Sequence, residues 1–258
     1  MSQPAFEIVN SILDIWKIAI QAIMFLVLWA AAFREKKSKR DGIAAVLFIL
    51  ANIGIGFLPC AAWVRYGVSA FVIMGYAGIC YKKQIGKAVF VMLAFYNLHC
   101  LSFLIANSIY MKITGVMMKS LDAMQESYMQ QVYQCLSVGM AVSALFYMVL
   151  YVAMAVIFHS LIKGEAVMAW QDIILLSILN FVGSMIANVV NGLLIVRINT
   201  DAFVLFDEKP DLLWKIPMIV VLIFAGEAAL IYFWQRYRIL LAERQKHFVE
   251  EQQVKAMR

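Results

Sequence analysis

Charged residues are scarce in this sequence, and their scarcity is the first indication of its class. Asp, Glu, Lys and Arg together make up 15% of the 258 residues, whereas apolar residues make up 64%. An average soluble domain is about one quarter charged. The apolar residues lie in runs of about 18 or more, the length that crosses a hydrocarbon core of about 30 Å. The sequence therefore predicts a polytopic membrane protein and excludes a water-soluble globular fold.

Metal-binding and catalytic motifs are lacking as well. The four cysteines show no CxxC pair or other spacing typical of metal ligands. The sequence contains no GxxxxGK[ST] phosphate loop, no HExxH zinc motif and no GxSxG nucleophile elbow. We therefore predict no catalytic residue, metal or cofactor in these residues, and whether the chain serves an enzyme stays open.

The apolar runs predict an all-α fold, a polytopic transmembrane bundle of about seven helices. An odd number of spans differs from the two equal repeats of many secondary transporters. We expect residues 1–234 to form the transmembrane domain and residues 235–258 a cytoplasmic helix. The predicted spans are 8–33, 43–59, 67–81, 88–111, 136–162, 173–196 and 213–234.

Basic residues are unevenly divided between the two sides of this predicted bundle. Fifteen of the 22 fall on the side of the C-terminus: Arg34, Lys36, Lys37, Lys39, Arg40, Lys82, Lys83, Lys87, Lys163, Arg236, Arg238, Arg244, Lys246, Lys255 and Arg258. Six fall on the other side: Arg65, Lys112, Lys119, Arg197, Lys209 and Lys215. Because Lys and Arg favour the cytoplasmic side, we expect the N-terminus outside a bacterial plasma membrane. The net charge of +6 then reflects this topology, and no nucleic acid partner is predicted.

Ionisable residues at membrane depth are costly and are candidates for function. Asp14 and Lys17 lie three residues apart, so they share one helix face and can form an ion pair. Glu227 lies inside the seventh span among small residues, where a proton-coupled role and a packed polar contact are both open. His99 is interpreted as a hydrogen-bonded packing residue, since a single nearby cysteine cannot complete a metal site.

A polar stripe marks the sixth span. Its members follow spacings of four, four and three, which place them on one helix face: Asn180, Ser184, Asn188 and Asn191. Lipid would penalise such a face, so it must meet another helix or subunit. Hydrogen bonds between helices and the lining of a cavity or signalling seam are both consistent with it.

Two outer segments are candidates for ligand contact. Residues 113–133 predict an amphipathic helix at the interface, with an extended fifth helix as the alternative. The other segment, 198–213, mixes apolar and acidic residues and suits an apolar peptide with a basic group. The ligand-contact candidates are Met117, Leu121, Met124, Tyr128, Phe203 and Phe206. Cys60 and Cys135 fall near this side, where a disulfide and two free thiols are both open.

The polar tail continues the seventh span and has a thin apolar seam, which predicts a helix that depends on a partner. That seam consists of Tyr237, Leu240, Leu241, Phe248 and Val254. The spans followed by LLAERQKHFVEEQQVKAMR resemble the membrane-sensor half of a GHKL-type sensor histidine kinase. That family includes accessory-gene-regulator-type receptors for cyclic peptide pheromones, which act in two-component quorum sensing.

The resemblance implies that the tail leads to a phosphoacceptor helix and an ATP-binding domain, with a response regulator as partner. The family's acceptor histidine is followed by an acidic residue and then Asn, whereas His247 is followed by Phe248. His247 is therefore interpreted as a solvated helix residue. No acceptor motif lies in residues 1–258, so two expectations stand: a kinase core follows Arg258, or the protein signals in another way.

The leading hypothesis is a homodimeric membrane input domain that senses an extracellular signal, such as a peptide, and relays it through the last span. Its candidate transmission residues are Glu227, the asparagine stripe, Arg236 and Arg238. The alternative is a small transporter or substrate-binding membrane subunit whose pocket combines the stripe, His99 and Glu227.

Overall fold

Helices dominate the computed structural model of the chain. The structure describes residues 2–33, 39–58, 62–80, 85–121, 127–162, 170–193, 195–198, 201–204 and 212–256. Within them lie seven helices: α1 (Gln3–Phe33), α2 (Lys39–Gly56), α3 (Ala62–Cys80), α4 (Ile85–Lys119), α5 (Tyr128–Ile162), α6 (Trp170–Leu193) and α7 (Leu212–Ala256). Two short antiparallel strands, β1 (Ile195–Ile198) and β2 (Asp201–Val204), form a hairpin between α6 and α7.

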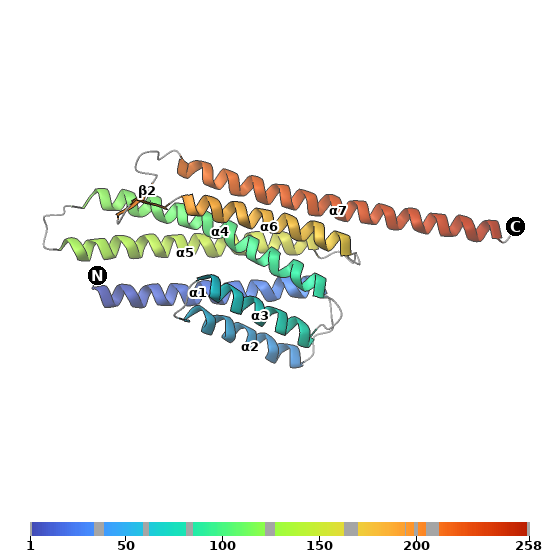
Figure 1. Ribbon diagram of the computed structural model, residues 1–258, viewed down its shortest axis with the longest axis horizontal. Coiled ribbons are helices and arrows are strands. Elements are labelled where there is room, and N and C mark those ends of the chain that lie inside the picture. Colours follow the sequence, from blue (N-terminus) through green and yellow to red (C-terminus); the bar gives the residue numbers. More distant parts are fainter. Residues whose placement is uncertain are drawn as a thin grey trace.

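The helices run back and forth between two ends of the molecule, so the N- and C-termini lie at opposite ends (Figure 1). Five of the described helices are long and apolar enough to cross a membrane, namely α1, α4, α5, α6 and α7. Shorter apolar stretches lie in α2 (Ala45–Gly56) and α3 (Gly67–Tyr76). These lengths are compatible with a multi-pass membrane protein.

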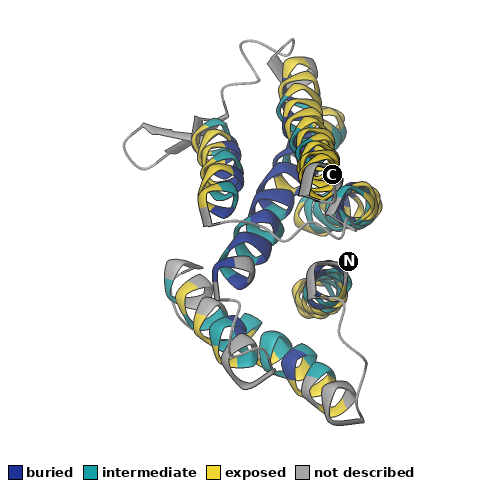
Figure 2. Cartoon of the chain, turned by 90° about the vertical axis from the view of Figure 1, so that its right-hand side faces the viewer, coloured by how far each residue is buried: buried dark blue, intermediate teal, exposed yellow. Residues whose placement is uncertain are grey.

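Helix α4 forms the centre of the bundle. In α4, 61% of the apolar span is buried, against 33% or less in the other four long helices. Figure 2 shows it as the helix with the most buried surface, with the other elements arranged around it. Because α4 contacts α1, α3, α5, α6 and α7, any movement in it reaches most of the bundle.

Aromatic side chains fill the core between the first four helices. The Phe25 ring lies 5.0 Å from Phe48 of α2 and 5.3 Å from Phe95 of α4, between ring centroids. Trp29 meets Tyr76 of α3 at 5.5 Å. Edge and stacked contacts of this kind add to the apolar area that the rings bury. This cluster attaches α2 and α3 to the central helix.

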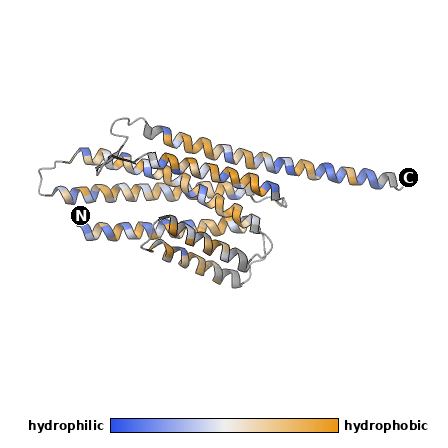
Figure 3. Cartoon of the chain, viewed as in Figure 1, coloured by the Kyte–Doolittle hydropathy of each residue, from blue (hydrophilic) through white to orange (hydrophobic). Residues whose placement is uncertain are grey.

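Outward faces are apolar along the spans and polar along the tail of α7 (Figure 3). Large apolar side chains such as Phe71, Leu222 and Phe233 face outward, as expected of helices in contact with lipid. Beyond Leu241, every α7 side chain that the structure describes is exposed, through Gln253. α7 thus leaves the bundle as a single unsupported helix.

Two predictions about the outer segments differ from the structure. Residues 113–133 do not form one amphipathic helix, because 113–119 end α4, whereas 128–133 begin α5 and agree with the alternative of an extended fifth helix. The helical spacing of their apolar residues continues the long helices. The sixth span also ends at Leu193, not at residue 196, because Ile195 begins β1. β-Branched residues at 195, 196 and 198 favour a strand there.

Candidate functional site

Polar groups lie on two faces of α4, and the first set surrounds the acid of α7. Glu227 is 2% exposed, and Asn97 and Asn180 beside it are equally buried. Asn97 Nδ2 donates to Glu227 Oε2 at 2.7 Å and approaches Asn180 Oδ1 at 3.4 Å. Three helices, α4, α6 and α7, therefore meet at one buried amide and its carboxyl partner.

Gly183 of α6 makes this close approach possible. A Cβ at Gly183 would collide with Glu227 Oε1 and would lie 2.7 Å from Asn97 Oδ1. Glycine has no Cβ, so the carboxyl and amide groups occupy that space. The sequence motif around Glu227 indicated tight packing through small residues of α7, but the small residue that the carboxyl contacts lies on α6.

The asparagine stripe of α6 faces α4 along its length. Asn188 Nδ2 lies 3.3 Å from Tyr96 Oη, and Asn191 Oδ1 accepts from Asn107 Nδ2 at 2.7 Å. Ser184, which is buried, donates within α6 to the Phe181 carbonyl. The stripe thus forms hydrogen bonds between helices, and no described residue of it lines the cavities found beside α1.

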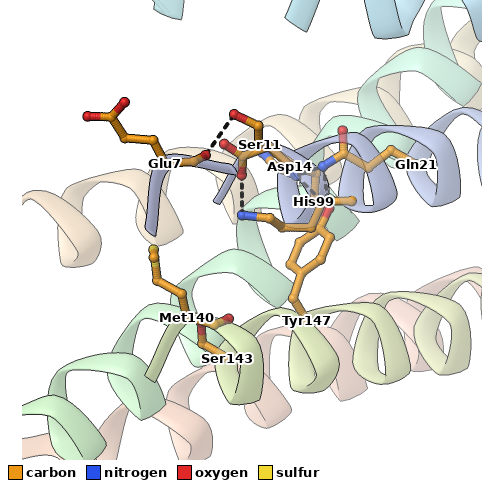
Figure 4. Close-up of polar contacts among 9 residues, drawn as sticks. Glu7, Ser11, Asp14, Gln21, His99, Met140, Ser143 and Tyr147 are labelled. Carbon is orange, nitrogen blue, oxygen red and sulfur yellow. Dashed lines mark hydrogen bonds and ion pairs between the residues drawn. The ribbon is translucent and has the colours of Figure 1, made fainter. Parts of the chain in front are cut away.

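The second polar cluster surrounds His99, in the same turn of α4 (Figure 4). Gln21 Nε2 of α1 lies 2.6 Å from Tyr147 Oη of α5 and 3.0 Å from His99 Nδ1. His99 Nδ1 is also 2.8 Å from Tyr147 Oη, which closes a triangle. Residues two apart on a helix are about 200° apart, so Asn97 and His99 point to different neighbours. His99 is a hydrogen-bonded packing residue, as predicted.

Cavities open beside this triangle, between α1 and its neighbours. One, of about 340 Å³, has Asp14, Lys17 and Gln21 among its lining residues. A second, of about 250 Å³, shares Gln21 and His99 but is mainly apolar, with Ile73 and Phe95 in its wall. Cavities of a few hundred Å³ with a few polar groups among apolar walls are typical of small-molecule sites.

Lys17 is the basic side chain of this region. Its Nζ lies 2.6 Å from Asp14 Oδ1, which confirms the predicted ion pair. Asp14 is 47% exposed and Lys17 30% exposed. A third cavity, of about 240 Å³, extends from Lys17 past Tyr110 toward Ser143 of α5. Lys17 therefore borders two adjoining cavities, and an entering anion could compete with the more exposed Asp14.

An ion pair fastens the second half of α7 to α6. Arg238 pairs with Asp172 in the first turn of α6. Arg236 instead contacts its own helix, where Nε donates to Tyr232 Oη at 3.0 Å. Of the two arginines predicted to transmit a signal, the structure connects Arg238 to another helix.

The predicted outer ligand contacts are spread over several elements. Met117 lies in the last turns of α4, Leu121 just after that helix, and Tyr128 at the start of α5. Phe203 pairs with Val196 in the hairpin backbone. Met124 and Phe206 lie outside the described residues, as does Cys60, whereas Cys135 is a buried free thiol.

Several partners could not be identified from sequence. Gln21, Tyr147, Asn107 and Asp172 are each the partner of a predicted residue, yet they look like ordinary polar residues within or beside apolar runs. Asn97 also looks like an ordinary polar residue, although its position inside an apolar span indicates that it needs a polar partner. Among the described residues, no group of three or more His, Cys, Asp or Glu could hold a metal ion.

Comparison with known proteins adds no relative: no protein-family model, curated protein or solved structure matches the chain.

Proposed function

We propose that this chain is the transmembrane input domain of a signal-transducing receptor. The observation that carries the proposal is α7, one continuous helix of 45 residues. Its first half holds the buried Glu227 contact inside the bundle, and beyond Leu241 its described residues stand free of the bundle. A single helix that joins a packed polar centre to an unsupported tail suits the relay of a conformational change.

All seven helices cross the membrane in this proposal, with the N-terminus outside and the tail in the cytoplasm of a bacterial cell. The support is the bias of 15 basic residues toward the C-terminal side, together with the alternating direction of the helices. In this arrangement Asp14 and Lys17 lie toward the outer side, so the cavities beside them open to an extracellular molecule.

The cavities beside Gln21 and His99 are the proposed ligand site. Their charged mouth and apolar interior suit a small amphipathic molecule, such as the end of a short apolar peptide. The outer residues Met117, Leu121 and Tyr128 remain candidates for contact with the rest of a larger ligand. A ligand that favours one of two bundle packings would shift their populations.

The signal would pass through α4, because one turn of this helix borders both polar clusters. His99 contacts the cavity side, and Asn97 contacts Glu227 on α7. A displacement of this turn by ligand would change the packing of α7 and hence the position of the tail.

The proposed output is a homodimer of tails that acts on a cytoplasmic domain or partner. The tail presents an open groove along one face, lined by Leu241, Arg244, Gln245, Phe248 and Val249. Exposed apolar side chains on a lone helix favour a partner helix. With the resemblance to GHKL-type sensor kinases, this supports a two-component output through a histidine kinase core and its response regulator.

Filling the cavity tests the proposal without knowledge of the ligand. Ser69 lines both cavities beside Gln21, so Ser69→Phe should mimic occupancy. Cysteines introduced one at a time over residues 237–252, in a chain without native cysteines, should cross-link between subunits with helical periodicity. The pattern should differ between Ser69→Phe and the unfilled protein.

The matched control is Val46→Phe, which adds the same ring on an outward face of α2. It should leave the cross-linking pattern unchanged. Tails that show no contact between subunits in any of these proteins would contradict the dimeric output.

A transporter is the second candidate, and the observation in its favour is the polar cavity at membrane depth. The single pocket predicted from the stripe, His99 and Glu227 is not formed, since His99 lines the cavities and Glu227 faces the other side of α4. Uptake of a labelled solute into proteoliposomes, blocked by Ser69→Phe, would favour transport over signalling.

A further inference from the structure

The buried acid of α7 and its amide partner each have one unsatisfied oxygen. Asn97 Nδ2 donates to Glu227 Oε2, but Asn97 Oδ1 and Glu227 Oε1 have no hydrogen-bond partner. Both unsatisfied oxygens border the same space beside Gly183. In the part of the chain that the structure describes, two buried acceptors therefore share one gap that no donor enters.

One proton would satisfy both atoms. A carboxylic acid has one O–H donor and one carbonyl acceptor, and a primary amide offers the complementary acceptor and donor. Buried polar atoms without partners cost free energy, and an ionised carboxylate at membrane depth costs more. We infer that Glu227 and Asn97 form a carboxylic acid–amide pair that holds one proton between Oε1 and Oδ1 and ties α7 to α4.

No basic side chain replaces this proton among the described residues. Ion pairs join Lys17 to Asp14 and Arg238 to Asp172, and His247 lies beside Glu250; none of these contacts includes Glu227. Asp172–Arg238 is the charged pair shared by α6 and α7, 11 residues further along α7 than Glu227.

The titratable side chains of the helices packed against α7 differ in their contacts. On α4, His99 contacts Gln21, and Cys100 Sγ lies 3.5 Å from Asn188 Nδ2. On α5, Tyr147 contacts His99, whereas the Tyr151 hydroxyl is buried without a hydrogen-bond partner and its ring meets Phe95. The α6 groups nearest Glu227 are the neutral Asn180 and Gly183. The acid–amide pair is therefore the titratable contact that joins α7 to α4.

Loss of this proton would place a carboxylate oxygen against the amide oxygen of Asn97. Two acceptors repel each other, so the contact between α4 and α7 would open. This consequence for signalling rests on the proposed function, in which the position of α7 sets the state of the tail. The presence of the proton itself does not depend on that function.

Infrared difference spectroscopy of the full chain in lipid nanodiscs tests for the proton. At neutral pH we expect the C=O stretching band of a protonated carboxylic acid, lost in Glu227→Gln and retained in Asp14→Asn. Asn97→Leu should move the band to higher frequency, because the acid loses its amide partner. A band that is absent, that survives in Glu227→Gln or that is unchanged in Asn97→Leu would overturn the inference.

Spin labels test whether the proton controls α7. Labels at the exposed positions Gln171 on α6 and Gln245 on the tail report the position of the helix. In the wild-type chain the distance between them should change as alkaline pH removes the band. In Glu227→Gln, whose neutral amide keeps a complementary pair with Asn97, the distance should not depend on pH. A pH-dependent distance that persists in Glu227→Gln would overturn this control of α7.

The two proposals fail in different experiments. If the tails never cross-link but the infrared band behaves as expected, the proton pair stands and the dimeric receptor does not. If the band is absent but cavity filling alters the tail, the receptor stands without the proton pair.

Discussion

At the scale of single residues, the contact between α4, α6 and α7 depends on the missing side chain of Gly183. The nearest atoms to a Cβ there are the Glu227 carboxyl and the Asn97 amide, and neither belongs to a flexible surface side chain. Because both groups are buried, they have little room to retreat. A methyl group at this position must separate helices that hydrogen bonds now hold together.

We predict that Gly183→Ala destabilises the fold by about 1–3 kcal/mol, the usual range for overpacking a filled site. The measurement is thermal unfolding in detergent, monitored through the reactivity of the buried Cys135 thiol as it becomes accessible. Gly192→Ala is the matched control on the same helix, since a Cβ there meets nothing within 4 Å. Equal losses of stability in both variants would contradict the proposed crowding.

The same site shows how far sequence reasoning reaches among residues. Glu227 and Asn180 stood out because polar groups are costly in apolar spans. Their shared partner, Asn97, could not be assigned, because helical spacing orders residues on one helix and says nothing about which face meets another helix. The close approach of Glu227 and Asn97 to Gly183 depends on how the helices pack, so it could not be predicted from the sequence either.

At the scale of elements, α7 is held against the bundle by its ion pair with α6. Arg238 and Asp172 are partly buried, with 29% and 17% of their side chains exposed. Asp172 also lies in the first turn of α6, where its negative charge interacts favourably with the positive end of the helix dipole. The pair therefore fixes the tail at the point where it leaves the bundle.

A double-mutant cycle of Arg238→Gln and Asp172→Asn should give a coupling energy of about 0.5–1 kcal/mol, reduced by high salt. Chemical unfolding of all four proteins measures it. Arg236→Gln should cost less than Arg238→Gln, since Arg236 contacts its own helix at Tyr232. No coupling between Arg238 and Asp172 would show that the pair does not restrain α7.

Long apolar elements were predicted well, and their ends were not. Each of the seven predicted spans contains a helix in the described residues, and five of these helices are long and apolar enough to cross a membrane. The interfacial helix expected at 113–133 was wrong and the alternative of an extended fifth helix was correct for 128–133, because apolar spacing is the same in an interfacial helix and in extensions of α4 and α5. The hairpin of β1 and β2 was missed because its strands have four residues each.

At the scale of the whole molecule, the termini lie at opposite ends of the bundle (Figure 1). In the proposed topology these ends lie on opposite sides of the membrane, with the basic residues biased to the C-terminal side. Exposed positions exist at both ends, at Ser120 beyond α4 and at Gln245 on the tail. Topology can therefore be measured directly.

Single cysteines at Ser120 and Gln245, in a chain without native cysteines, should react differently with a membrane-impermeant maleimide on intact cells. We predict labelling of Ser120→Cys at once and of Gln245→Cys only after permeabilisation. Leu104→Cys, at a fully buried position, reports background labelling. The reverse pattern would invert the orientation, and labelling of both on intact cells would exclude an odd number of passes between these two positions.

The uninterrupted length of α7 makes it a lever with unequal arms. From Arg238 to Ala256 the helix extends about 27 Å at the usual rise per residue, beyond the ion pair with Asp172 that holds it to α6. A tilt of about 5° around Arg238 would displace the far end by roughly 2 Å over that length. A rearrangement of the bundle too small to disturb its own packing is thereby magnified into a displacement that a neighbouring helix can register.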